Sequence, residues 1–162
     1  MDKDTLYAHI LKDEFTFSPI QRSWLADMCT AYANHRSLRL YGCAGRGRVD
    51  VLARFAAAVL DTDAAARLCY IGLTGRQCDA WLATVSTLRT HVPRGKLQVI
   101  SAHYLTIFDY LGSKRFTIIL LQDGVYIADS VWKTIMEEAP VVIDLNALDM
   151  DKAKDEGDFP VD

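Results

Sequence analysis

The sequence has 162 residues, of which 51% are hydrophobic and 24% are charged, and its net charge is −3. This composition is typical of one globular domain with a substantial core, and it excludes a disordered chain. No apolar run is long enough to cross a bilayer, and residues 1–15 lack the pattern of a signal peptide. We therefore expect a cytoplasmic protein with no membrane partner.

Two helices are expected before the first strand. Residues 2–13 place Leu6, Ile10 and Leu11 on one helical face. Ser18 and Pro19 give the N-cap and first residue of a helix that continues to residue 34. In this second helix the apolar side chains at helical spacing predict a broad stripe packed on the core, formed by Ile20, Trp24, Leu25, Met28 and Tyr32.

Strands alternate with helices from residue 38 onward. In chain order the sequence predicts a strand at 38–41, a helix at 48–60, a strand at 68–73, a helix at 77–90, a strand at 97–100, a helix at 103–111, a strand at 116–121, a helix at 130–138 and a strand at 141–143. This alternation predicts an α/β fold, a three-layer sandwich with a mainly parallel central sheet and right-handed crossovers. We expect residues 1–148 to form this single domain and residues 149–162 to form an acidic, flexible tail.

The cysteines give no sign of a metal site. Cys29, Cys43, Cys69 and Cys78 form no CxxC pair, and the four histidines are scattered. Buried, reduced thiols are the expectation for all four, and no metal ligand is predicted.

A glycine-rich turn, Gly42-Cys43-Ala44-Gly45-Arg46-Gly47, lies between the first predicted strand and the helix at 48–60. Glycines let the backbone approach an anion, and the following helix N-terminus supplies N–H groups. The order therefore predicts a phosphate loop of the form GxxxxGK[ST]. However, Arg48 replaces the lysine that reaches the β- and γ-phosphates, and Val49 replaces the hydroxyl that holds Mg²⁺.

The second element of an ATPase site is also altered. An apolar strand should end in Asp-Glu, but here the strand at 116–121 is followed by Gln122-Asp123-Gly124. Gln122 then occupies the position of the metal-binding aspartate, and Asp123 occupies the position of the catalytic glutamate. One register further on, Asp123 takes the metal position and Gly124 replaces the acid. Because neither register gives a complete site, we predict no catalytic residue, no cofactor, and at most weak binding of ATP or another phosphate ligand.

These segments resemble known ATPases. Phe17-Ser18-Pro19-Ile20-Gln21 resembles the adenine-side glutamine motif of helicase-like ATPases. Residues 45–49 resemble the GRGKS loop of the RecD-like helicase module in tRNA-methionine cytidine acetyltransferases, and residues 122–127 with the following helix and strand resemble that module's DEAAAIP segment. The ATPase domain of phage terminase large subunits shows a similar order of motifs. The resemblance covers about residues 15–146.

The resemblance implies a P-loop NTPase-like fold and a degenerate nucleotide site. Gln21 would contact adenine, and Gln122 and Asp123 would lie beside the γ-phosphate. The implied phosphate-loop residues are Gly42, Gly45, Arg46, Gly47, Arg48 and Val49. A terminase-type ancestry would imply viral DNA packaging or interference with a host machine, with the host cytoplasm as the setting.

Three functions remain open from the sequence. The leading one is an inactive P-loop ATPase-like module that binds a protein or nucleic-acid partner. The second is a weak ATPase or nucleotide-sensing switch that uses Arg48 and Asp123. The third is a nucleic-acid-binding accessory domain, because residues 36–115 carry twelve basic and five acidic side chains, a balance of +7. Tyr126 and Trp132 are the candidate residues for a protein interface.

Overall fold

The computed structural model describes residues 2–12, 15–41, 47–89, 95–101, 116–122, 125, 128–137 and 140–145. Its elements are α1 (Lys3–Leu11), α2 (Pro19–Ala33), β1 (Leu38–Leu40), α3 (Arg48–Thr62), β2 (Leu68–Gly72), α4 (Gly75–Leu88), β3 (Leu97–Ser101), β4 (Ile118–Leu121), α6 (Asp129–Met136) and β5 (Val141–Leu145). The predicted helix at 103–111 and the acidic tail lie outside the described residues.

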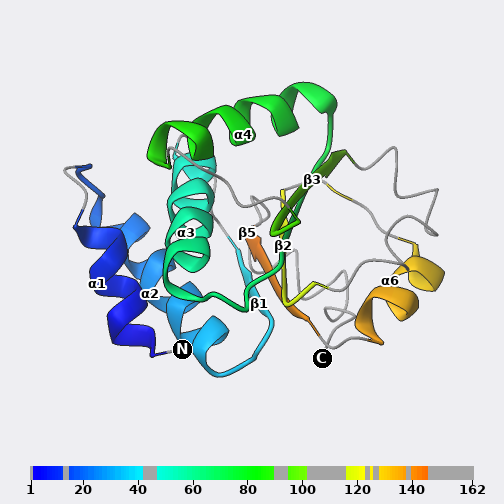
Figure 1. Ribbon diagram of the computed structural model, residues 1–162, viewed down its shortest axis with the longest axis horizontal. Coiled ribbons are helices and arrows are strands. Elements are labelled where there is room, and N and C mark those ends of the chain that lie inside the picture. The colour runs from blue at the N-terminus through cyan, green and yellow to red at the C-terminus, as the bar shows by residue number, and fades with distance from the viewer. Residues whose placement is uncertain are drawn as a thin grey trace.

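The α/β fold class is confirmed. Five strands form one sheet in the order β1-β5-β4-β2-β3, and every pairing that the structure describes is parallel. Figure 1 shows α1, α2, α3 and α4 gathered on one side of this sheet and α6 on the other. The chain moves from β1 to β2 and β3 through α3 and α4, and returns from β4 to β5 through α6. The chain thus crosses the sheet in one direction over one face and in the other direction over the other face. This is the arrangement in which all of these crossovers have the same handedness.

Two hydrophobic cores follow from the alternation of side chains along the strands. The larger core joins α1, α2, α3 and α4 to the sheet face that carries Leu68, Tyr70, Ile118, Leu120, Val141 and Ile143. The smaller core joins α6 to the opposite face, which carries Cys69, Ile71, Ile100, Ile119, Leu121 and Val142. Both faces are therefore covered, and this explains why the central strands are apolar throughout.

Two helices begin with side-chain capping hydrogen bonds, which are reciprocal at α2. At α2 the predicted N-cap is confirmed, because Ser18 Oγ accepts from the backbone N–H of Gln21 and Gln21 Oε1 accepts from the N–H of Ser18 at 2.9 Å. At α4, Thr74 Oγ1 accepts from the N–H of Gln77, and Gln77 Oε1 accepts from the N–H of Leu73 at 3.0 Å. These pairs fix where both helices start and satisfy N–H groups that lack helical partners.

The expectation that Ile20 belongs to the core stripe of α2 is wrong, since this side chain is 57% exposed. Ile20 lies in the first turn, one turn before Trp24 and Leu25 enter the core. Leu11, in the last turn of α1, is likewise exposed. Both apolar side chains lie at a helix end, where the neighbouring helices no longer cover that face.

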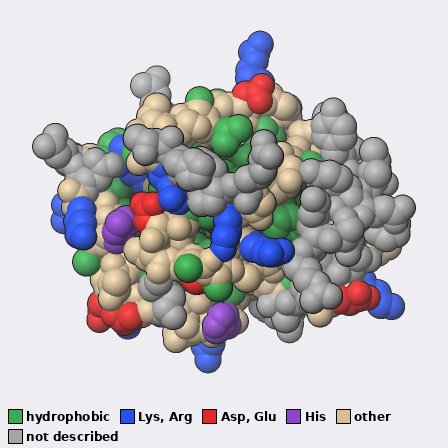
Figure 2. Space-filling model, in the orientation of Figure 1, with side chains coloured by type: hydrophobic (Ala, Val, Ile, Leu, Met, Phe, Trp, Pro, Cys, Tyr) green, Lys and Arg blue, Asp and Glu red, His purple; other side chains and the backbone are tan. Residues whose placement is uncertain are grey.

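The described surface is of mixed character. Figure 2 shows Lys and Arg side chains spread across one face of the molecule, with acidic side chains between them. Of the helices that the structure describes, none combines the length and the apolar character needed to cross a membrane.

Candidate phosphate-loop site

The described phosphate-loop candidates Gly47, Arg48 and Val49 lie at the same edge of the sheet as Gln122. In a parallel sheet the carboxyl ends of all strands lie at the same edge. β1 ends there before α3 begins at Arg48, β2 ends there before α4, and β4 ends there at Gln122, with β5 lying between β1 and β4. Five predicted site residues lie outside the described part of the chain: Gly42, Gly45, Arg46, Asp123 and Tyr126.

Gln21 and Gly47, 26 positions apart in the numbering, are in contact. Gly47 has φ +101° and caps α3, and its carbonyl accepts the N–H of Val51 at 2.8 Å. A Cβ added to Gly47 would collide with Nε2 of Gln21. The motif glutamine thus meets the last glycine of the loop through its amide nitrogen, while its oxygen caps α2. The structure brings together two residues that the resemblance assigned to one nucleotide site.

Arg48 and Val49 are the first two residues of α3, and their side chains have different surroundings. The Nε and Nη1 atoms of Arg48 are buried inside the protein. Val49 is half-buried and packs against the larger core. Valine at this position therefore serves packing, and it carries no oxygen that could bind a cation.

Gln122 is held in place by its neighbours. It is 7% exposed, its N–H donates to the carbonyl of Ile71 at 3.0 Å, and its Oε1 accepts the hydroxyl of Tyr70 at 2.7 Å. The Tyr70 ring stacks on Trp81 with centroids 4.1 Å apart and 6° between the planes. At the end of β4 the structure thus has a neutral, buried amide whose oxygen is already hydrogen-bonded.

The pKa of Tyr70 shows which groups surround its hydroxyl. Burial raises this pKa above its usual value, and Cys78 acts in the same direction. The positive charge of Arg48 acts against both, which places Arg48 among the groups near Tyr70. Because the pKa stays raised, Tyr70 is a neutral hydrogen-bond donor to Gln122 at neutral pH.

The sequence did not predict an ion pair that links β1 to β5. Arg39 and Asp144 are register partners in the parallel ladder, and Arg39 Nε lies 3.1 Å from Asp144 Oδ2. The Asp144 side chain is only 8% exposed. The only available signal was a single charge within each apolar strand, Leu38-Arg39-Leu40 and Val142-Ile143-Asp144. Pairing the two charges required knowledge of the strand order.

Trp132 is a correction to the sequence analysis. The sequence made it a candidate for a protein interface, but it is 8% exposed and belongs to the smaller core under α6. The large indole packs against the sheet because α6 is the described helix that covers this face.

The described cysteines are buried and free of disulfides, as expected for Cys29, Cys69 and Cys78, whereas Cys43 lies outside the described residues. Burial raises the pKa of the Cys29 thiol to about 12 and also raises the pKa of Cys69 and of Cys78. In the described part of the chain, no three His, Cys, Asp or Glu side chains gather into a group that could hold a metal ion.

The fold and this edge define the class of the protein: an α/β protein with a parallel sheet, helices on both faces and a helix-capping glycine at the carboxyl edge. No protein-family model matches the chain, and no curated protein matches it either. The likeness to helicase and terminase ATPases therefore rests on the motifs quoted above.

Proposed function

We propose that the chain is a P-loop ATPase-like module that does not hydrolyse ATP and instead acts by binding a negatively charged partner at the carboxyl edge of its sheet. The observation that carries this proposal is the state of Gln122, a buried neutral amide whose oxygen already accepts the Tyr70 hydroxyl at 2.7 Å. Hydrolysis of ATP depends on Mg²⁺ held by a carboxylate and by a hydroxyl of the loop.

Two changes act together against a metal site. A magnesium ion at Gln122 would have to displace the Tyr70 hydrogen bond and would gain only a neutral oxygen. Val49 offers no oxygen and packs on the core. Because neither Gln122 nor Val49 supplies a charged or hydroxyl ligand to a metal, the second hypothesis, a weak ATPase or a nucleotide-sensing switch using Arg48 and Asp123, is less well supported.

The same edge favours an anionic partner. The N-termini of α3 and α4 follow the carboxyl ends of β1 and β2, and the N-terminus of α2 joins them through the contact between Gln21 and Gly47. Each helix N-terminus carries a partial positive charge. Arg22 and Arg76 lie exposed in the first turns of α2 and α4 and add full charges. A phosphate backbone is the partner that this charge pattern suits, so we propose nucleic acid as the partner.

The absence of hydrolysis is tested by calorimetric titration with ATP and Mg²⁺ and by a sensitive phosphate-release assay. The protein should release phosphate no faster than buffer, and Asp123→Asn should behave as the parent does. Hydrolysis that disappears in Asp123→Asn would refute the proposal and establish the ATPase hypothesis.

The partner is tested with a labelled oligothymidine of about 20 nucleotides, long enough to span several contacts. Its affinity should fall as salt rises, and Arg22→Gln combined with Arg76→Gln should lower the salt slope by about 1.4, since each contact to a single strand contributes about 0.7. Lys133→Gln is the matched control, because Lys133 is exposed on α6, across the sheet. Salt-independent binding, or an equal effect of the control, would contradict a nucleic-acid partner and leave a protein partner.

A further inference from the structure

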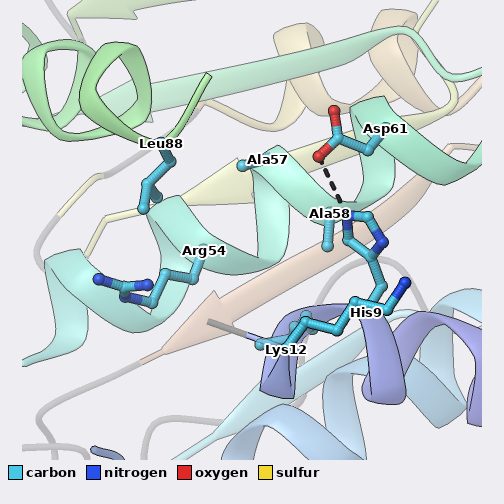
Figure 3. Close-up of a pocket in the computed structure, with 8 residues that line it drawn as sticks. His9, Lys12, Arg54, Ala57, Ala58, Asp61 and Leu88 are labelled. Atoms are coloured by element: carbon cyan, nitrogen blue, oxygen red, sulfur yellow. Dashed lines mark hydrogen bonds and ion pairs between the residues drawn. The ribbon is translucent and has the colours of Figure 1, made fainter. Parts of the chain in front are cut away.

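A cavity lies toward the C-terminal end of α3, away from its N-cap Gly47. It has a volume of about 240 Å³ and is lined by His9 and Ile10 of α1, by Lys12 that caps the C-terminus of α1, by Arg54, Ala57, Ala58 and Asp61 of α3, and by Leu88 of α4. Figure 3 shows these side chains around a shared opening between the three helices. Asp61 is 13 residues beyond Arg48 in a continuous helix, a separation of about 20 Å along the helix axis. The cavity is therefore separate from the candidate site.

The base of the cavity is apolar. Ala57 and Ala58 are buried on α3, and their short side chains leave space between α1 and α4. Ile10 and Leu88 add hydrocarbon surface from the two flanking helices. A ligand in this cavity would gain affinity by burying a compact apolar body.

The acidic group of the rim already has two partners. Asp61 Oδ2 lies 3.1 Å from His9 Nε2, and its Oδ1 lies 3.1 Å from Nε of Arg89. Figure 3 shows the His9 and Asp61 side chains pointing toward one another across the space between α1 and α3. Since Asp61 shares its two oxygens between two partners, its negative charge does little to repel an anion.

Two further cations line the cavity. Lys12 is exposed at the end of α1. Arg54 lies on the opposite side of the opening, and its guanidinium carbon is 4.0 Å from the centroid of the Phe15 ring, a contact that holds the side chain in place. The lining therefore combines an apolar base with a positively charged rim.

We propose that this cavity binds a small organic anion, in which a carboxylate or phosphate group is attached to a compact apolar body. The anionic group lies between Lys12 and Arg54, and the apolar body lies on Ala57, Ala58 and Leu88. The volume is below the 300 Å³ or so at which drug-sized sites begin, which limits the body to about one ring or a short branched chain.

The test uses phenyl phosphate as the probe and ¹⁵N-labelled full-length protein. Amide signals of Ile10, Ala57, Ala58 and Leu88 should shift in a saturable way during the titration. Benzyl alcohol and inorganic phosphate serve as comparison probes, because each offers only one half of the proposed ligand. The dissociation constant of each should be at least about tenfold larger than that of phenyl phosphate.

Two variants locate the binding. Lys12→Gln should weaken phenyl phosphate binding about fivefold, whereas Lys3→Gln, an exposed lysine on the same helix outside the lining, should leave it unchanged. Ala57→Leu should abolish binding by filling the cavity. Ala57 lines the cavity but does not belong to the larger core cluster, so the variant should fold normally, as a thermal melt would show.

Several results would overturn the proposal. The site is wrong if phenyl phosphate shifts signals near Gly47 and not those of the cavity. The anion requirement is wrong if benzyl alcohol binds as well as phenyl phosphate, or if both lysine variants weaken binding equally. The apolar requirement is wrong if inorganic phosphate binds as well, or if a folded Ala57→Leu variant retains full affinity.

Discussion

Replacing Gly47 with alanine should destabilise the fold for two separate reasons. First, Gly47 has φ +101° and ψ −9°, a conformation that costs an L-residue about 1–2 kcal/mol. Second, the new Cβ would collide with Nε2 of Gln21. Moving the Gln21 amide away from this Cβ disrupts the hydrogen bond between its Oε1 and the N–H of Ser18, which adds about 1 kcal/mol. We therefore expect a loss of about 2–3 kcal/mol, measured by urea unfolding followed by circular dichroism.

A double-mutant cycle separates the two causes. Gln21→Ala removes the colliding group and should itself cost about 1 kcal/mol, because the capping pair at α2 is lost. In that background Gly47→Ala should cost only the backbone strain. The sum of the two single-variant losses in unfolding free energy should therefore exceed the loss in the double variant by about 1 kcal/mol.

The matched control is Gly75→Ala at the start of α4. A Cβ added there meets no atom within 4 Å, so stability should stay the same or rise by less than about 1 kcal/mol. Our reasoning would be refuted if the losses at Gln21 and Gly47 add to within about 0.3 kcal/mol, since the two residues would then not be in contact. It would also be refuted if Gly75→Ala costs as much as Gly47→Ala.

Three further outcomes are expected. Tyr70→Phe should lower the free energy of unfolding by about 1–2 kcal/mol, because the buried oxygen of Gln122 loses its donor, and an unchanged urea midpoint would argue against that bond. Asp144→Asn should cost about 3 kcal/mol by leaving Arg39 beside a neutral amide, and Arg39→Met with Asp144→Leu should recover most of that loss in the same assay. The free energy of unfolding should fall above about pH 9, because the pKa of the Cys29 thiol is 9.0 in the unfolded chain and about 12 in the folded protein. Cys29→Ala should reduce that fall by about 2 kcal/mol between pH 9 and 10.5. An identical pH profile in Cys29→Ala would contradict the raised pKa.

Much of the fold could be predicted from local sequence. The predicted strands and helices that fall within the described residues are present, and their ends differ from the prediction by a few residues. Capping residues such as Ser18 act within one helical turn, and continuous apolar runs such as residues 68–71 mark strands buried on both faces. The wrong assignment of Ile20 to the core concerns which side of a helix end is covered, and that depends on neighbouring helices.

The site was predictable only where its residues are close in sequence. Gly47, Arg48 and Val49 could be located because a glycine turn between a strand and a helix is a local pattern. By contrast, the hydrogen bond between Tyr70 and Gln122 joins the ends of β2 and β4, which are neighbours only because of the strand order. Long-range pairing of this kind leaves no periodic signal in a single sequence.

Under the proposed function, the contacts at the carboxyl edge explain how the fold is stable without a bound metal. A metal-binding carboxylate at position 122 would lie in a buried position, where its charge is costly unless a cation accompanies it. Gln122 avoids that cost because its amide is neutral and its oxygen accepts the Tyr70 hydroxyl, whose ring is stacked on Trp81. Val49 likewise adds apolar contact where a hydroxyl would need a ligand. Under the proposed function, Gln122 and Val49 thus make contacts within the protein at positions where an ATPase would bind a metal, and the helix N-termini at the same edge can still attract an anion.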